Sequence, residues 1–315
     1  MRWRLDGLHL AGTGVARPGA VPGLESVTTA EAARRLGVAP RPSPVQTRAW
    51  ASDPGHPPRA DAVDLAFGAA VDALAAAAVP IASIDLVVLA SSTPSRPTAS
   101  DAHRLATRLG VDGAAWDLRA GGAGGLIAWA QGASALRDGA RAVLVVAVER
   151  ITPWLDPADV AAWMHYADAA AALVLTPGRA RLHARAGHAP SVGRPFTVPA
   201  GLPPEPGATM RAQRPDAAYL AALAEAWERA NADLAAASAP GLDLLLPYAV
   251  TPEQVATAAA RVPARRVFST LETDGCTGAA SPLLALHRSG PPVGRIGAVA
   301  VGGGISWSTL LWEEA

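Results

Sequence analysis

A glycine-rich turn lies where the surrounding sequence leads one to expect a reactive side chain. The segment DLRAGGAGGL, Asp117 to Leu126, follows a strand-like stretch and precedes a helical pattern, which predicts a sharp strand-to-helix turn. A helix N-terminus favours negative charge, so a nucleophile in such a turn would be activated. The turn holds Gly121, Gly122, Gly124 and Gly125, with no Ser, Cys or Thr. The pattern is typical of a catalytic turn that lacks its nucleophile.

Composition excludes several classes of function. The chain has 315 residues and a formal net charge of zero, with 27 basic and 27 acidic residues, so we expect no nucleic-acid partner. All the basic residues are Arg, and without Lys there is no Schiff-base or P-loop lysine. The single cysteine, Cys276, excludes an internal disulfide and fits a reducing compartment.

The sequence also lacks the usual targeting and metal-binding signals. The N-terminal MRWRLDGLHLAGTG has no signal-peptide run, and Asp72 interrupts the longest alanine-rich stretch. We therefore expect a cytoplasmic protein with no membrane partner. The histidines His103, His183, His188 and His287 show no metal-ligand spacing, so no metal is expected.

Short apolar runs alternate with amphipathic helical patterns along the chain, which predicts an α/β layered architecture. The predicted strands are near-continuous apolar runs, as in sheets covered on both faces: 84–92, 142–149, 171–176, 242–248 and 296–304. The predicted helices are 62–79, 100–109, 126–137, 217–237, 252–261 and 279–287. The Pro/Gly-rich stretch 187–208 is the best candidate for a connection between two halves.

The two halves share a pattern. In each, a glycine-containing turn leads into a helix, a further glycine and a buried strand, and the same spacing separates Gly124 from Gly139 and Gly275 from Gly290. An internal duplication would give this pattern, and so would two unrelated βα units with glycines at similar places, so the spacing leaves both interpretations open.

Six blocks of the chain, in the right order, resemble the initiating ketosynthases of the thiolase superfamily, the β-ketoacyl-ACP synthase III proteins and their polyketide-pathway relatives. The blocks are IDLVVLASSTPSRPTASDAHRLATRLG, DLRAGGAGGL, DPADVAAWMHYADAAAALVL, LLLPYAVTPEQ, LETDGCTGAAS and VGGGISWSTLLWEE. The resemblance implies a thiolase-like five-layered αβαβα fold with two pseudo-repeated, intertwined halves, 1–180 and 181–315. It further implies a dimer acting on acyl thioesters of CoA or of acyl carrier protein, with no other cofactor.

The family's chemistry needs a Cys nucleophile together with a His and an Asn that support decarboxylation and stabilise the enolate. By the resemblance, these positions are held by Gly122, Tyr248 and Cys276. A hydrogen atom cannot attack a thioester, and a Tyr with a pKa of about 10 is a poor base at neutral pH. Loss of a whole catalytic unit costs on the order of 10⁶ in rate in other systems. The ordinary condensation is therefore not expected.

Four further residues depart from the family or are expected near substrate. Glu253 stands where the family often has a basic residue for docking the acidic carrier protein, and a carboxylate there would repel it. Arg96 stands where the interface loop usually presents an apolar residue to the partner's acyl pocket. Thr251 and Trp163 are the other residues we expect to contact substrate; for Trp163, core packing is the alternative.

The chemistry could instead have moved to other residues of the same pocket. By the resemblance, Cys276 and His165 face this pocket, and a Cys/His pair is a nucleophile and base combination. Tyr248 could then donate a hydrogen bond to an oxyanion. The alternative is that Cys276 is a small buried apolar residue and His165 a satisfied, half-buried one.

The turns around this pocket carry further candidates. The backbone N–H groups of Gly303 and Gly304 could serve an oxyanion hole beside Gly122. Asp274 is either a pocket carboxylate or a turn residue before glycine, and Asp168 is expected to fix a turn at a strand start.

Two hypotheses of function follow. The first is a non-condensing partner subunit, in a homodimer or in a heterodimer with an active ketosynthase III paralogue. The second is an unusual acyltransferase that uses an acyl-CoA or the phosphopantetheine thioester of an acyl carrier protein, by way of Cys276 and His165. Simultaneous replacement of the Cys, His and Asn favours the first hypothesis, whereas a pocket that holds Cys, His and Tyr keeps the second open.

Overall fold

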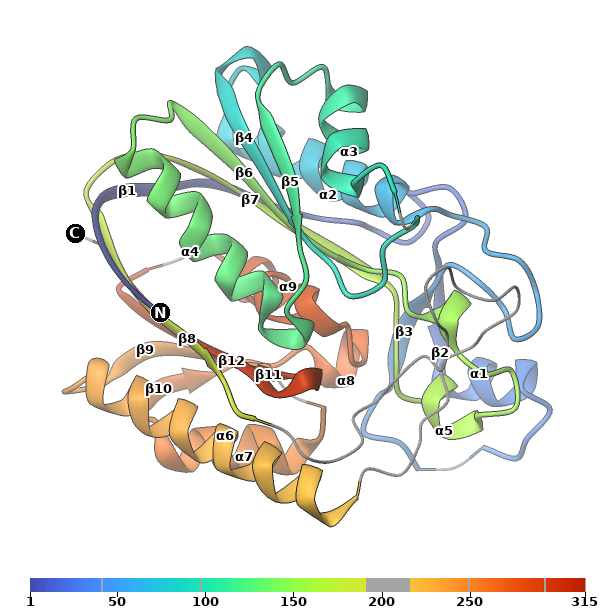
Figure 1. Cartoon of the computed structure of the whole chain (residues 1–315). Coiled ribbons are helices and arrows are strands. Elements are labelled where there is room, and N and C mark those ends of the chain that lie inside the picture. Colours follow the sequence, from blue (N-terminus) through green and yellow to red (C-terminus); the bar gives the residue numbers. More distant parts are fainter. Residues whose placement is uncertain (41, 97, 191–215, 249, 292, 315) are drawn as a thin grey trace.

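Figure 1 shows the computed structural model, which describes residues 1–40, 42–96, 98–190, 216–248, 250–291 and 293–314. Of the predicted connection 187–208, residues 191–208 lie outside the described part of the chain. All five predicted strands and all six predicted helices are present, with boundaries shifted by a few residues. No helix in the described ranges is both long enough and apolar enough to span a membrane.

Ten strands form one hydrogen-bonded sheet that is built from two sets of five. In spatial order from the middle outwards, the first set is β1 (Arg2–Val15), β7 (Ala169–Pro177), β6 (Ala142–Glu149), β4 (Ile84–Ala90) and β5 (Ala114–Leu118). The second set is β8 (Ala180–His188), β12 (Ser306–Glu313), β11 (Arg295–Gly302), β9 (Leu242–Pro247) and β10 (Ala264–Val267). Counted along the chain, both sets have the order first, fifth, fourth, second, third. The two sets therefore repeat one topology, and they meet where β1 pairs antiparallel with β8.

Helices lie in three layers around the two sets of strands, which confirms the predicted five-layered αβαβα architecture (Figure 1). The helices α2 (Ala62–Ala77) and α3 (Asp101–Leu109) cover the outer face of the first set. The helices α6 (Ala217–Ala237) and α7 (Pro252–Arg261) cover the second. Between the sets lie α4 (Gly124–Arg137) and α9 (Ser281–Arg288), which contact each other and strands of both sets.

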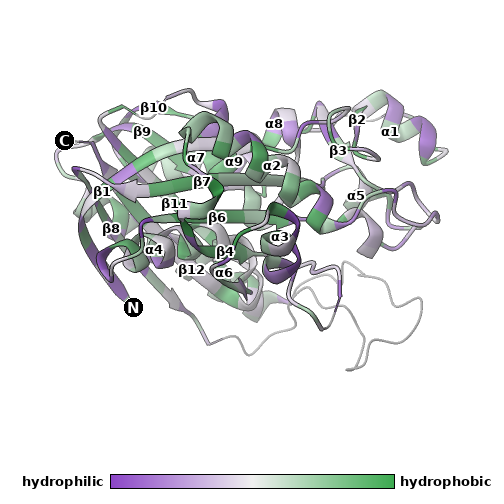
Figure 2. Ribbon diagram, turned by 90° about the horizontal axis from the view of Figure 1, so that it is seen from above, coloured by the Kyte–Doolittle hydropathy of each residue, from purple (hydrophilic) through white to green (hydrophobic). Residues whose placement is uncertain are grey.

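Burial explains why the apolar runs became the central strands. Every residue of β6 is buried, as expected for a strand covered on both faces. Figure 2 shows the strands β6, β7 and β11 at the centre of the molecule as predominantly hydrophobic. Close packing also requires small residues: a Cβ at Gly14 of β1 would lie 2.2 Å from the backbone nitrogen of Ala73 in α2.

A small layer beside the main body was not predicted from the sequence. It comprises β2 (Glu25–Thr28), α1 (Thr29–Arg35), β3 (Thr47–Trp50) and α5 (Val160–Trp163). Its own core includes Trp50 and Trp163, whose rings meet edge to face with centroids 5.0 Å apart. The short helix α8 (Leu271–Asp274) packs against β3 and leads into the turn that carries Cys276.

Candidate active site

Three turns from distant parts of the chain converge at the N-terminus of α4. They are the 3₁₀ turn η2 (Gly121–Ala123) before α4, η4 (Gly278–Ala280) before α9, and η5 (Gly303–Ile305) after β11. The approach of η2 and the end of β11 is so close that a Cβ at Gly302 would lie 2.2 Å from the backbone nitrogen of Gly122. The repeated topology therefore places the matching turns of both halves side by side.

The Tyr248 side chain fills the space in front of Gly122. A Cβ built at Gly122 would lie 2.6 Å from Cε1 and 2.7 Å from Cζ of the Tyr248 ring. Tyr248 directly follows β9, its backbone N–H donates to the carbonyl of Val299 at 2.8 Å, and its side chain is buried. The glycine at 122 and the tyrosine at 248 are thus sterically complementary, because neither position tolerates a larger partner.

The tyrosine hydroxyl in turn meets the only cysteine. The Tyr248 Oη and Cys276 Sγ atoms are 3.6 Å apart, and both residues are buried. Burial raises the pKa of the Cys276 thiol to about 11, although the contact with Tyr248 and the backbone N–H of Gly278 oppose this. Burial also raises the pKa of Tyr248 well above its usual value, and the neighbouring Cys276 adds to the effect. Both groups are therefore protonated and neutral at physiological pH.

His165 is joined to Cys276 through the backbone. The Cys276 N–H donates to the His165 carbonyl at 3.0 Å, and the Ala167 N–H donates to the Cys276 carbonyl at 3.1 Å. The His165 ring packs edge to face on Tyr166, with centroids 5.1 Å apart, and its buried Nε2 has no hydrogen-bond partner in the described structure. Within the described residues, no hydrogen bond links the imidazole to the Cys276 thiol. The predicted dyad residues are therefore neighbours whose side chains do not form a dyad here.

The environment of His165 makes stability depend on pH. Burial lowers its pKa to about 4, with the positive charge of the buried Arg48 as the second cause. Between pH 6.5 and about 4 the unfolded chain therefore binds a proton at this residue that the folded chain does not, so stability falls as pH falls through this window. The full effect is about 3 kcal/mol. Urea unfolding of His165→Gln should show a flatter pH dependence than the original chain, whereas His103→Gln, at an exposed position, should not. Equal slopes for His165→Gln and the original chain would contradict the burial of this imidazole.

Three further residues near this site, Tyr166, Tyr219 and Glu149, do not stand out as site residues in the sequence. Tyr166 and Tyr219 are the first two: Cys276 is among the causes that raise the pKa of Tyr166 and of Tyr248, and Tyr219 in turn neighbours Tyr166. Nothing in the local sequence of either residue marks it. The sequence does mark Glu149 as unusual, because it is a lone carboxylate at the end of a wholly apolar run.

Glu149 ties the two halves together behind Cys276. Its carboxylate accepts hydrogen bonds from the backbone N–H of Ser92 at 3.1 Å, from Thr93 Oγ1 at 2.7 Å and from the backbone N–H of Ala279 at 3.2 Å. Burial raises the pKa of Glu149, and these donors oppose the rise. Three donors from two segments explain how a fully buried carboxyl group is accommodated.

The glycines of η5 are open to solvent. Gly303 and Gly304 are exposed, and a Cβ at either would meet no atom within 4 Å among the described residues. Gly304 has a φ of +71°, which favours glycine. Beside this turn, a Cβ on Gly121 would lie 2.9 Å from the Gly303 carbonyl oxygen. The turn thus lies beside η2, and its N–H groups remain candidates for an oxyanion hole.

Asp274 and Asp168 both have partners that stabilise turns. The Asp274 carboxylate pairs with Arg288 at 2.8 Å and accepts from Thr273 Oγ1 at 2.7 Å. Asp168 is fully buried and accepts from the backbone N–H groups of Ala51 at 2.6 Å and Thr152 at 2.8 Å, which holds the start of β7 against the loop after β3.

The residues predicted to contact substrate lie in a helix cap, in the small layer and on the surface. Thr251 is the N-cap of α7, where it accepts from the Gln254 N–H at 3.4 Å in a capping box. Trp163 is fully buried in the small layer, and its indole N–H donates to the Asp156 carbonyl at 3.0 Å. Arg96 is exposed. For Trp163, the structure matches the core-packing alternative.

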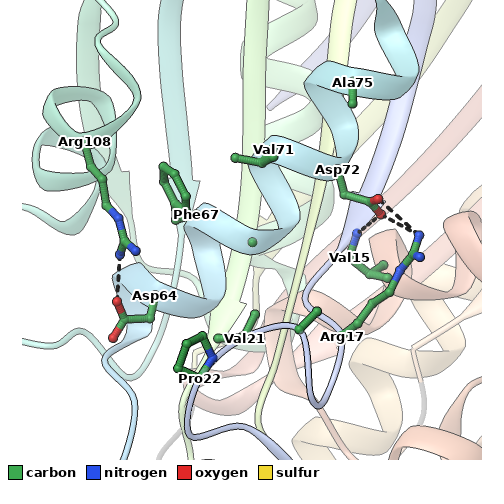
Figure 3. A pocket seen from close by; sticks show the side chains of 12 residues that line it. Val15, Arg17, Val21, Pro22, Asp64, Phe67, Val71, Asp72, Ala75 and Arg108 are labelled. Carbon is green, nitrogen blue, oxygen red and sulfur yellow. Dashed lines mark hydrogen bonds and ion pairs between the residues drawn. The ribbon is translucent and has the colours of Figure 1, made fainter.

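Two hollows of the surface lie elsewhere. The larger, with a volume of about 440 Å³, lies on α2, and Figure 3 shows it flanked by the Arg17–Asp72 and Arg108–Asp64 ion pairs. The smaller, of about 270 Å³, lies on the outer face of β1 and β8. Neither is lined by Gly122, Tyr248 or Cys276. Among the described residues, no group of three His, Cys, Asp or Glu side chains could hold a metal ion.

Comparisons with known proteins agree with this topology. The family model of 3-oxoacyl-[acyl-carrier-protein (ACP)] synthase III matches residues 116–188. The β-ketoacyl-[acyl-carrier-protein] synthase III 3 of Streptomyces coelicolor is 33% identical over 278 residues, covering 79% of this chain and 82% of that protein. The β-ketoacyl-[acyl-carrier-protein] synthase III of Rhodopirellula baltica is 34% identical over 179 residues, covering 55% of this chain and 48% of that protein.

Solved structures extend the similarity to the whole fold. The crystal structure of 3-oxoacyl-(acyl carrier protein) synthase III from Pseudomonas aeruginosa PAO1 superimposes with a TM-score of 0.81 at 26% identity, covering 98% of each chain. The resemblance seen in the six sequence blocks is thereby confirmed. The chain belongs to the β-ketoacyl-[acyl-carrier-protein] synthase III family of the thiolase superfamily, a ketosynthase family of fatty-acid and polyketide biosynthesis.

Proposed function

We propose that this chain is a non-condensing member of its family that serves as a partner subunit of an active ketosynthase III paralogue. Gly122, Tyr248 and Cys276 take the positions of the family's Cys, His and Asn in this account. The observation that carries the proposal is the Tyr248 ring, which lies 2.6 Å from the point where a Cβ at Gly122 would be. A side chain that could carry an acyl group has no room there.

The protonation states of the site support the same conclusion. A ketosynthase needs a thiolate nucleophile, and the only thiol of this chain has a pKa raised to about 11 by burial. The neighbouring Tyr248 has a pKa well above its usual value and cannot act as a base at neutral pH. The site therefore contains no activated nucleophile next to an available base.

An open sheet edge offers a surface for the partner. Among the described strands, the edge strand β5 pairs with β4 alone; all of its residues are at least partly exposed, and Trp116 is 44% exposed. The opposite edge, β10, carries Arg265 and Arg266, and charged side chains protect an edge from pairing. The charged residue of β5, Asp117, accepts hydrogen bonds from the backbone N–H groups of Asp101 and Ala102, and its neighbour Trp116 is apolar and exposed, so we expect a partner strand to pair with this edge.

Native mass spectrometry after co-expression with an active paralogue tests the partner role. We expect a heterodimer, and we expect Trp116→Glu to weaken it at least tenfold, because a charge would be buried in the interface. The matched control is Leu220→Glu, which places the same charge at an exposed apolar position of α6, on the other set of strands. A chain that stays monomeric alone and with every paralogue would overturn the partner role. Dimers unaffected by Trp116→Glu would exclude β5 as the contact.

The alternative is an unusual acyltransferase that uses an acyl-CoA or acyl-carrier-protein thioester. The contact of 3.6 Å between Tyr248 Oη and Cys276 Sγ favours it, because a phenol beside a thiol could stabilise a thiolate or an oxyanion. His165 would be the base, and its backbone contact with Cys276 keeps the two residues adjacent.

The rate of thiol labelling measures the reactivity of Cys276. With a pKa of about 11, the thiolate fraction at pH 7.5 is about 300-fold below that of an ordinary cysteine, and burial slows access further. Iodoacetamide should therefore label the folded chain at least 300-fold more slowly than the unfolded chain at pH 7.5. The rate should rise about tenfold per pH unit between pH 7 and 9. A folded-state rate close to that of the unfolded chain would support the acyltransferase instead.

A further inference from the structure

The outer face of the seam between the two halves carries a concentration of positive charge. Arg2 and Arg4 on β1, with His183 and Arg185 on β8, line the smaller hollow, which has a volume of about 270 Å³. We call this the seam hollow. Its remaining lining is mostly apolar and includes Ala236, Ala237 and Leu311.

The register of β1 and β8 makes these residues cross-strand neighbours. Arg2 pairs with Arg185 and Arg4 pairs with His183 across the antiparallel β1–β8 ladder. Residues directly opposite in an antiparallel pair have neighbouring side chains, and like charges there destabilise the sheet. The register thus places the side chains of Arg2 and Arg185 next to each other on one face of the ladder, where like charges repel.

One carboxylate faces this group. Asp233 of α6 forms an ion pair with Arg185 and accepts a hydrogen bond from Thr309 Oγ1 at 2.8 Å, so both of its oxygens are occupied. Among the described residues, no carboxylate forms an ion pair with Arg2 or Arg4. Arg185 is further held in place above the Trp307 ring, 5.7 Å from its centroid.

The hollow on α2 shows what a charge-balanced site of this protein looks like. There, Arg17 pairs with Asp72 at 3.0 Å and Arg108 pairs with Asp64 at 2.7 Å, so each guanidinium has its own carboxylate (Figure 3). The seam hollow has three guanidinium groups and one carboxylate. The seam hollow therefore has more positively charged hydrogen-bond donors than carboxylates to pair with them, whereas the hollow on α2 has equal numbers.

We propose that the seam hollow binds a phosphate-bearing anion, such as the diphosphate or triphosphate group of a small molecule. Guanidinium groups match phosphate oxygens in a bidentate geometry, and a bound anion would relieve the repulsion between Arg2 and Arg185. The volume of the hollow suits a small charged group and is below the usual range for a whole drug-sized ligand. Because the site is concave, it fits such a group better than the convex acidic surface of a protein.

Isothermal titration calorimetry with inorganic triphosphate, pyrophosphate and phosphate tests the proposal on the tag-free full chain. We expect one site, with affinity increasing from phosphate to triphosphate and decreasing with added salt. Arg2→Ala and Arg4→Ala should each weaken triphosphate binding about tenfold, the usual effect of losing a hydrogen bond between charged groups. Arg17→Ala and Arg108→Ala, at the other hollow, should leave the affinity unchanged.

One variant should change affinity in the opposite direction. Asp233→Asn removes the competing negative charge and keeps an oxygen that can accept from Thr309, so triphosphate should bind several-fold more tightly. This result separates a built site from a diffuse positive surface. The proposal is overturned if triphosphate does not bind, if all four Arg→Ala variants weaken it equally, or if an acidic protein binds the seam while triphosphate does not displace it.

Discussion

Introducing a thiol at Gly122 is expected to give a less stable protein that still cannot be acylated. In Gly122→Cys, the new Cβ would lie 2.6 Å from the Tyr248 ring, and the ring is buried and cannot move aside freely. Overpacking of this kind costs about 1–3 kcal/mol. The thiol would also lack a base, because the pKa of Tyr248 is raised well above its usual value. Guanidinium unfolding and intact-mass measurement after incubation with acyl-CoA check the two parts separately.

Two matched variants separate the steric effect of a side chain at position 122 from the chemical effect of a thiol there. Gly122→Ala adds a Cβ without a thiol and should lose the same stability as Gly122→Cys. The triple variant Gly122→Cys, Tyr248→His, Cys276→Asn removes the ring and supplies the family's three groups, so it should recover stability and accept an acyl group. Efficient acylation of Gly122→Cys alone would show that Tyr248 does not block the position.

Removing the Tyr248 ring is expected to have the largest effect on stability at this site. Tyr248→Ala leaves a cavity between Gly122 and Cys276, and such truncation of a buried aromatic side chain costs about 3–5 kcal/mol. The cavity should also expose the thiol, so that iodoacetamide labels Cys276 at least tenfold faster than in the original chain. Chemical unfolding midpoints and labelling rates measure both effects.

Tyr248→Phe is the control for the hydroxyl group. It keeps the ring next to Gly122 and loses only the 3.6 Å contact with Cys276 Sγ, which costs about 1 kcal/mol. The labelling rate should then stay close to that of the original chain. If the Phe and Ala variants behaved alike, the hydroxyl rather than the ring would define the site, and the steric account would fail.

Much of the fold could be predicted because its signals are local or periodic. Near-continuous apolar runs predicted the central strands, and helical periodicity predicted helices of all three helical layers. The shared spacing after Gly124 and Gly275 left open a duplication, which the two equal strand orders now display. The small layer around Trp50 and Trp163 was missed, because its strands are four residues long and are stabilised by contacts distant in sequence.

Residues of the site that belong to a sequence motif could be predicted, whereas residues placed there by tertiary packing could not. The motif resemblance identified the positions Gly122, Tyr248 and Cys276. It could not predict that the Tyr248 ring occupies the space beside Gly122, because that depends on side-chain packing. Tyr166 lies beside Cys276 and Tyr219 lies beside Tyr166, and both belong to segments that carry no local signal. The role of Thr251 could have been predicted from the sequence, because a threonine three residues before Gln254 is typical of a capping box at a helix N-terminus.

If the chain is a non-condensing partner subunit, as proposed, it forms no acyl-enzyme. Intact-mass spectrometry after incubation with acyl-CoA, acyl-carrier protein and malonyl-carrier protein tests it most directly, with Cys276→Ser as the matched variant. We expect an unchanged mass for both proteins and no condensed product from the chain alone. An acyl adduct on the original chain that is absent from Cys276→Ser would contradict the proposal, and would assign the nucleophile to the thiol beside Tyr248.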